Sequence, residues 1–331
     1  AGHSIAPWPA GTRFIMRRIV LIACGGTIAG QADASGRFRP TGHAAELLAG
    51  VTVPPGIQVT ALDALTVPSR AMSLADVLQL VERVEAMAAD EQPPDGVVIS
   101  QGTDTLEETA YLFALMCRAR LPVVLTGAMR PGVVAGSDGP ANLAAAIAVA
   151  AQAEAATLGP LLVFGDEIHA ARWATKIHTS RPAAFASPGA GPVGVVSEGR
   201  VRLWGAPASP PLGRPRELSH RVELLTMTSG DDGRLAEAAG NYAHGLVIAA
   251  MGGGHVPPAA AAVLTALAQR IPVVLASRCA AGPVLTSTYR GVGAESDLIA
   301  QGLLPVGNLQ PLKARLRLLV QRLPQQRVVA A

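Results

Sequence analysis

The segment Gly102-Thr103-Asp104 places a hydroxyl and a carboxylate side by side. Just upstream, Val97 to Ile99 is a short apolar run that predicts a buried strand. Downstream of Leu106, apolar residues recur at helical spacing. The segment is therefore expected to form the turn between a strand's carboxyl end and a helix's amino end, where open α/β sheets bind ligands. We take this turn as the first candidate for a functional site.

The start of the following helix also has a recognisable pattern. Thr105 is expected to cap the helix, and Glu108, three residues on, would complete a capping box. Glu107 and Glu108 both suit the positive end of the helix dipole. Taken alone, Asp104 would ordinarily be a solvated turn residue. The spacing therefore predicts a well-formed turn and leaves its function open.

A second turn follows the first predicted strand of the chain, Arg18 to Ala23. In Cys24-Gly25-Gly26-Thr27, two glycines let the backbone turn tightly and present main-chain N–H groups to a ligand. The turn lacks the GxGxxG pattern, the Walker lysine and an acidic residue about 20 positions further on, so it is a poor nucleotide site. A purely structural turn with Thr27 as a helix cap stays open as the alternative.

Composition narrows the function classes. The chain has 331 residues, half of them apolar, which favours two domains with a sizeable core. Aromatic residues make up only 3% and the net charge is +3, without a basic run, so nucleic acid is not an expected partner. No apolar run is long enough to span a membrane. Only two of the 27 basic residues are lysines, Lys176 and Lys313, which makes each of them noteworthy.

The three cysteines, Cys24, Cys117 and Cys279, are odd in number and lack metal-ligand spacing. They are expected to be reduced and mostly buried thiols, and no metal is expected. Residues 1–15 are polar and rich in Pro and Gly, which predicts a disordered extension or tag. A cytoplasmic location is the expectation, although a periplasmic or secreted one stays open because a cleaved signal peptide would leave no trace.

Strands and helices alternate along the chain, which is typical of a parallel sheet covered on both faces. We predict an α/β protein with a larger N-terminal domain (16–204) that contains a mainly parallel, flavodoxin-like sheet. A Pro- and Gly-dense linker (205–219) leads to a smaller C-terminal α/β domain (220–331). The predicted strands are 18–23, 57–62, 97–99, 122–126, 161–164, 222–226, 245–250 and 272–276.

Five blocks of sequence carry a family resemblance. In chain order they are LIACGGTIAG, SQGTDTLEETAYLF, VVLTGAMRP, ATK and NLQPLKARLRLLV. Over residues 17–323 the chain resembles the bacterial-type L-asparaginase family. That resemblance implies hydrolysis of a side-chain amide of a small amino acid, without metal or cofactor. It also implies a homotetramer of two intimate dimers, in which one subunit's large domain and its partner's small domain share each site.

The resemblance implies roles for individual residues. Thr27 matches the nucleophile, and Thr103, Asp104 and Lys176 match the other catalytic residues. A threonine hydroxyl needs a neighbouring base, and a lysine beside a carboxylate is suited to relay the proton. Backbone N–H groups of the glycine turns would stabilise the oxyanion. The expected substrate-binding set is Gly26, Ser69, Arg70, Gly102, Thr103, Asp104 and Ala128, with a plain turn serine as the alternative for Ser69.

Two departures from the family pattern affect the predicted site. The family commonly has a tyrosine in the loop after GGTIAG, whereas residues 37–42 here contain none and offer Phe38 instead. Many relatives also place a partner-subunit glutamate near the substrate's amino group. Here the candidates from the partner subunit are Tyr289, with Glu295 as an unaligned substitute, and Gly253 in a turn that lacks the usual asparagine.

Two functions from different classes remain. The first is an L-asparagine amidohydrolase that works through a threonine acyl-enzyme and has minor activity on L-glutamine. The second is a ligand-binding protein on the same scaffold with weak or no turnover. The complete set of Thr27, Thr103, Asp104 and Lys176 favours the enzyme, because a retired site has no physical need for a lysine–carboxylate pair. A nucleotide-binding protein is a distant third possibility.

Overall fold

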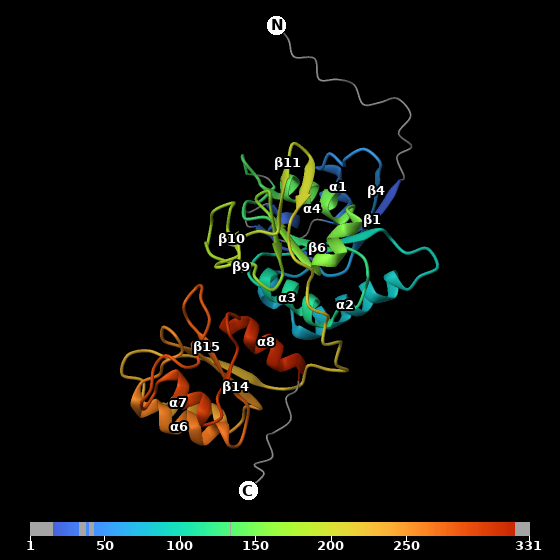
Figure 1. The fold of residues 1–331 in the computed structure, drawn as a ribbon. Coiled ribbons are helices and arrows are strands. Elements are labelled where there is room, and N and C mark those ends of the chain that lie inside the picture. Colours follow the sequence, from blue (N-terminus) through green and yellow to red (C-terminus); the bar gives the residue numbers. More distant parts are fainter. Residues whose placement is uncertain (1–15, 33–37, 40–42, 133, 322–331) are drawn as a thin grey trace.

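The computed structural model describes residues 16–32, 38–39, 43–132 and 134–321, and it contains two main sheets, one mostly parallel and one entirely parallel (Figure 1). One lies in the N-terminal part of the chain and the other in the C-terminal part, and residues between Leu203 and Val222 form neither helix nor strand. The predicted extension 1–15 and the loop segments 33–37 and 40–42 lie outside the described residues. The α/β fold class with a larger N-terminal sheet is confirmed.

The core of the N-terminal sheet consists of five parallel strands in the spatial order β4-β1-β5-β6-β7. Numbered along the chain, this order is 2-1-3-4-5, which is that of the flavodoxin-like fold. The strands read as almost continuous apolar runs because helices cover both faces of the sheet. Their bounds are β1 (Arg17–Ala23), β4 (Ile57–Asp63), β5 (Gly96–Ser100), β6 (Val123–Thr126) and β7 (Leu161–Phe164).

Three antiparallel strands extend this sheet beyond β7, and the sequence analysis did not predict them. They are β8 (Glu167–Ala170), β11 (Gly194–Ser197) and β12 (Arg200–Leu203). The tight turn Gly165-Asp166 joins β7 to β8, the turn Glu198-Gly199 joins β11 to β12, and all four residues have positive φ. Such turns match the twist of antiparallel strands. Each strand has only four residues, which is too short for a clear alternating pattern.

Helices cover the two faces of the N-terminal sheet. One apolar cluster joins the sheet to α2 (Leu74–Ala88) and α3 (Leu106–Met116), and a second joins it to α4 (Gly139–Ala150). The short α1 (Ala44–Ala49) packs near β4. At the start of α2, Ser73 and Asp76 form a capping box, in which each side chain accepts the backbone N–H of the other residue.

The C-terminal sheet is entirely parallel, with strands in the order β13-β14-β15-β16. Their bounds are β13 (Val222–Thr226), β14 (Gly245–Ala250), β15 (Val273–Ser277) and β16 (Leu304–Pro305). One face packs against α5 (Arg234–Gly240) and α6 (Pro258–Ala268), and α7 (Glu295–Ala300) adds Leu298 to that core. The closing helix α8 (Pro311–Gln321) contacts this sheet and also α3 of the N-terminal domain (Figure 1).

The contact between α3 and α8 makes one continuous core across the two domains. Leu112 and Phe113 on α3 belong to the same buried cluster as Leu316 and Leu318 on α8. α3 is therefore buried on nearly all sides, and not along a single face as its sequence predicts.

Two small antiparallel strand pairs complete the fold. They are β2 (Gln31–Ala32) with β3 (Phe38–Arg39), and β9 (Thr175–Lys176) with β10 (Phe185–Ala186). No described helix is long and apolar enough to cross a membrane.

Candidate active site

The site candidates gather where the strand order of the N-terminal sheet reverses. β1 and β5 are neighbours, with Ala23 paired to Ser100 at their carboxyl ends. The backbone N–H of Cys24 continues the pairing, donating to the Ser100 carbonyl at 2.8 Å. Chains leave two such strands toward opposite faces of the sheet, and the crevice between them is the usual ligand position in this fold. The turns that carry Thr27 and Thr103 therefore emerge side by side.

The two turns approach each other so closely that glycine is required at the contact. Gly26 has φ of +85°, and a Cβ there would lie 2.1 Å from the backbone nitrogen of Gly102. A Cβ on Gly102 would in turn lie 2.6 Å from the Ser69 hydroxyl. A side chain at position 26 would collide with the Gly102 backbone, and one at position 102 would force Ser69 to move. Immediately after this contact, Thr27 opens the short 3₁₀ helix Thr27–Ala29 and is half-buried.

A lysine from a distant part of the chain binds the turn after β5. Lys176 Nζ donates to the Thr103 hydroxyl at 2.8 Å and lies 3.3 Å from Asp104 Oδ1. Thr103 is buried and the lysine side chain is mostly covered, whereas the Asp104 side chain is 61% exposed. The structure thus brings Thr103, Asp104 and Lys176 together, although Lys176 is more than 70 residues away in sequence. The Asp104 carboxylate is therefore accessible to a ligand from solvent.

Ser69 supports the same turn from a third segment. It lies in the 3₁₀ helix Ser69–Ala71 and is buried, and its hydroxyl accepts the Asp104 N–H at 3.2 Å. The Thr105 hydroxyl donates to the Ser69 carbonyl at 3.1 Å, so it does not cap α3. The predicted capping box of Thr105 and Glu108 is therefore wrong, because the hydroxyl is used to join two turns. Arg70 is exposed beside Ser69.

A further turn, after β6, contains the buried Ala128. The carboxylate of Asp138 accepts the backbone N–H groups of Met129 and Arg130, at 3.0 and 2.8 Å. Asn142 donates to the Gly127 carbonyl at 3.0 Å and so fixes the start of the turn. Neither support was predicted from the sequence, although Asp138-Gly139-Pro140 directly before an alanine-rich run was a signal for the first.

Glu107 is the most important residue that sequence analysis assigned to a different role. It is buried at the start of α3, and its Oε1 accepts the backbone N–H of Lys176 at 3.3 Å. Its Oε2 lies 3.3 Å from Nζ of Lys313, on α8 of the other domain. The expected helix-dipole role does not describe these contacts. The scarcity of lysine was the only signal in the sequence, and it applies to Lys313, because Lys176 contacts this carboxylate through its backbone N–H.

The candidate residues of the C-terminal domain differ in whether their polar groups already have hydrogen-bond partners. Glu295 is fully buried, and its Oε1 accepts the backbone N–H groups of Thr288 and Tyr289 at 2.9 and 2.7 Å. Its Oε2 lies 3.1 Å from His255 Nε2. Burial acts to raise the pKa of Glu295, but these hydrogen bonds outweigh burial and hold the pKa below its usual value. Glu295 therefore serves as a brace within its own domain.

Tyr289 is half-exposed, with its ring edge-on to His255, and Gly253 lies in the turn after β14. The contribution of these residues and of Glu295 to a neighbouring subunit's site stays a prediction.

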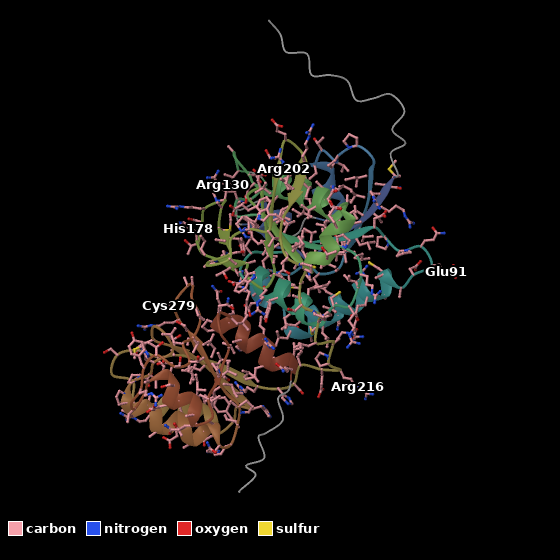
Figure 2. All side chains as sticks on the ribbon, in the orientation of Figure 1. Glu91, Arg130, His178, Arg202, Arg216 and Cys279 are labelled. Carbon is pink, nitrogen blue, oxygen red and sulfur yellow. The ribbon has the colours of Figure 1, made fainter. Side chains whose placement is uncertain are left out.

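The cysteines are not positioned as nucleophiles. Burial raises the pKa of Cys24 to about 12 and that of Cys117 to about 11, so both remain thiols at neutral pH. Cys279 is exposed on the C-terminal domain (Figure 2), and none of the three is in a disulfide, as expected.

Figure 2 also shows His178, which follows β9, and Arg130, in the turn after β6, on the same side of the N-terminal domain. Within the described residues, no group of three His, Cys, Asp or Glu side chains is placed to hold a metal.

The chain matches two protein-family models in succession. Residues 18–208 match the N-terminal domain of asparaginase, and residues 221–322 match the C-terminal domain of glutaminase/asparaginase. A solved structure of a "probable cytoplasmic L-asparaginase" from Campylobacter jejuni has a TM-score of 0.80 and 31% identity. The similarity covers 92% of this chain and 94% of that one.

Curated proteins agree with these matches. A "probable L-asparaginase" from Deinococcus radiodurans is 40% identical over 307 residues, which is 92% of each chain. A "glutaminase-asparaginase" from Pseudomonas fluorescens is 36% identical over 236 residues, covering 70% of this chain and 63% of that one. The matches extend over both domains and include every catalytic candidate in the N-terminal turns. The chain belongs to the asparaginase family.

Proposed function

We propose that this protein hydrolyses the side-chain amide of L-asparagine to L-aspartate and ammonia through an acyl-enzyme on Thr27. The observation that carries the proposal is the contact of Lys176 Nζ with both Thr103 and Asp104, in the turn that abuts Gly26. A lysine bridging a buried hydroxyl and a carboxylate is suited to proton transfer. The names of the relatives, L-asparaginase and glutaminase-asparaginase, support the same reaction.

The reaction divides into two displacements. Thr27 Oγ forms a bond to the amide carbon, the carbon–nitrogen bond breaks, and the hydroxyl proton leaves on the ammonia. Water then adds to the ester carbon, and its proton returns to Thr27 Oγ as L-aspartate departs. The Thr103–Lys176–Asp104 group relays the protons, an effect typically worth about 10²–10⁴-fold. Backbone N–H groups of the Gly26 and Gly102 turns stabilise the oxyanion of each intermediate.

The same turns orient the substrate. Asp104 has an exposed carboxylate oxygen for the α-ammonium group, and Ser69 lies directly behind it, within hydrogen-bonding distance of the Asp104 backbone. Charge-assisted hydrogen bonds of this kind contribute about 1.5–3 kcal/mol each. L-glutamine carries the same groups with one more methylene, so minor glutaminase activity belongs to the proposal.

We place the enzyme in the cytoplasm as a homotetramer of two intimate dimers with shared sites. The exposure of Tyr289 supports it as the residue offered to the neighbouring subunit. The buried contacts of Glu295 argue against that residue reaching out. Because residues 37–42 contain no tyrosine, either another group accepts the proton of Thr27 or acylation is slow.

Paired measurement of ammonia release from L-asparagine and L-glutamine tests the proposal. Wild type is expected to favour L-asparagine, and Thr27→Ala is expected to abolish release from both. Undiminished turnover in Thr27→Ala would contradict the assignment of the nucleophile. Asparagine that raises the melting temperature without any ammonia release would instead support the ligand-binding alternative.

A further inference from the structure

We propose that Lys313, on the closing helix of the C-terminal domain, is a positioning residue that fixes the catalytic Lys176 in the same subunit. This inference rests on the proposed function, because Lys313 is proposed to position a member of the proton relay described there. Lys313 does not touch Lys176 Nζ. It acts through Glu107 and through the two residues that precede Lys176.

Lys313 is completely buried, and acceptors surround its ammonium group. Its Nζ donates to the Ala174 carbonyl, to the Thr175 hydroxyl at 3.3 Å and to Glu107 Oε2 at 3.3 Å. All three protons of the ammonium therefore have partners, which offsets the high cost of burying a charge. All three acceptors belong to the N-terminal domain, whereas Lys313 belongs to the C-terminal domain.

Glu107 transmits this contact to the site. One of its oxygens binds Lys313, and the other accepts the backbone N–H of Lys176 at 3.3 Å. The carboxylate therefore links the buried ammonium of one lysine to the main chain of the other. Removing Lys313 would leave Glu107 as a buried charge without its partner, free to rotate away from Lys176.

A second contact holds the same segment from the same domain. The Thr175 hydroxyl donates to Gln310 Oε1 at 2.5 Å, and Gln310 Nε2 donates to the Ala280 carbonyl at 3.5 Å. Residues 174, 175 and 176 thus each have a hydrogen bond that leads to Lys313 or Gln310. Three successive residues are held by one helix start of the other domain.

Lys176 needs this support because its own strand is short. β9 consists of Thr175 and Lys176 alone, and it pairs with the equally short β10. A two-residue hairpin does not define a side-chain direction in the way that a strand inside the main sheet does. The chain also uses arginine at 25 of its 27 basic positions, since two are lysine. A compact ammonium with three donors fits three convergent acceptors, whereas a planar guanidinium does not.

Few charged groups act on Lys313, so removal of a positive or of a negative charge should have effects of opposite sign. Glu107 and Glu108 are the charged groups that act on Lys313, whereas Arg315 acts on Glu108 and not on the Lys313–Glu107 pair. Burial lowers the pKa of Lys313, and the adjacent Glu107 opposes that shift. Burial likewise raises the pKa of Glu108. Removing Lys313 would leave an uncompensated negative charge close to the relay. Removing Glu107 would leave an uncompensated positive charge there.

The experiment compares Lys313→Met, Glu107→Gln and their double variant by steady-state ammonia release over a range of pH. We expect Lys313→Met to lower kcat about 10–100-fold with KM within about twofold, because a displacement near 1 Å costs about 10²-fold in rate. The acid limb of its kcat profile should move to higher pH, since an unpaired Glu107 favours the protonated relay. Glu107→Gln should move that limb to lower pH, and the double variant should return it close to wild type.

Arg315→Met is the matched control. It removes a positive charge from the same helix, but its side chain donates to the Val222 carbonyl inside the C-terminal domain. Its kcat and pH profile should stay near those of wild type. If Lys313→Met does not fold, Thr175→Val serves in its place: it keeps every charge, removes the hydroxyl that meets Lys313 and Gln310, and should lower kcat about tenfold.

Two results would overturn the inference. One is a folded Lys313→Met or Thr175→Val enzyme with wild-type kcat. The other is a pair of single variants whose acid limbs shift in the same direction or do not shift. Failure of the proposed function looks different, because wild type itself would then release no ammonia from either amide.

Discussion

The two main sheets of this molecule differ in the spatial order of their parallel strands. In the N-terminal sheet the strand order reverses between β1 and β5, whereas β13 to β16 follow one another without reversal. At such a reversal the chain leaves the two strands toward opposite faces of the sheet, which opens a crevice beside the strand ends. The catalytic candidates Thr27, Thr103 and Asp104 all lie at that reversal.

The strand-end turns of the C-terminal sheet are closed by their own contacts. Met251 bridges to His255 across the glycine turn after β14, and the Ser277 hydroxyl donates to the Gly252 carbonyl at 2.6 Å. The buried carboxylate of Glu295 is taken up by His255 and by two backbone N–H groups. Similar glycine turns thus flank the proposed reactive site in one sheet and are held by their own contacts in the other. Topology and not composition makes the difference.

The largest expected effect comes from removing the lysine that spans the N-terminal crevice. Lys176→Met keeps the length of the side chain but deletes the contacts with Thr103 and Asp104. Loss of a general acid–base group lowers kcat by about 10²–10⁴-fold. Ammonia release under saturating L-asparagine measures this change. A loss below about tenfold would mean that the relay lies elsewhere.

The glycines of the two sheets offer the most direct comparison. Gly26→Ala would place a Cβ 2.1 Å from the Gly102 nitrogen, so the two N-terminal turns must separate, and kcat should fall about 10²-fold. Gly252→Ala is the matched change in the C-terminal turn. Its φ is +49° and a Cβ would meet only His255 Nδ1 at 3.9 Å.

Gly252→Ala should therefore cost about 1 kcal/mol of unfolding free energy, with kcat unchanged. Equal losses of kcat in both variants would remove the distinction between a reactive turn and a brace. Circular dichroism melts of the two variants, run beside the ammonia assay, separate stability from turnover.

Glu295→Gln tests the brace itself. The pKa of Glu295 is lowered in the fold, so its carboxylate stabilises the native state above the unfolded pKa, and this contribution is lost as pH falls through the folded value. The variant should melt earlier than wild type at neutral pH, and the difference should shrink in acid. At temperatures well below the melting temperature, kcat should stay near that of wild type. A selective loss of kcat with an unchanged melting temperature would instead make Glu295 a site residue.

The smallest expected effect concerns the loop after Thr27. Phe38 offers a ring but no proton, so Phe38→Tyr should raise turnover several-fold if the absent hydroxyl limits acylation. Arg39 and Pro40 are the neighbouring positions for the same substitution. No gain at any of the three would mean that the missing tyrosine is not the limiting feature.

Sequence patterns predicted the parallel strands well, because buried parallel strands are continuous apolar runs and their turns carry glycine. Short antiparallel strands such as β8 and β12 escaped prediction because four residues give too little periodicity. The resemblance named Thr103, Asp104 and Lys176, and the structure brings them into contact. The contacts of Glu107 with Lys313 could not be predicted, since they span 206 residues and depend on how two domains pack.

The central claim is that Thr27 at the sheet reversal carries the acyl group. The direct measurement is mass spectrometry of peptides from enzyme quenched in acid during turnover of L-asparagine. We predict a β-aspartyl adduct on the peptide that contains Thr27, lost in Thr27→Ala and accumulating in Lys176→Met if the relay serves deacylation. An adduct on Thr103, or turnover in Thr27→Ala at the wild-type rate, would contradict the account.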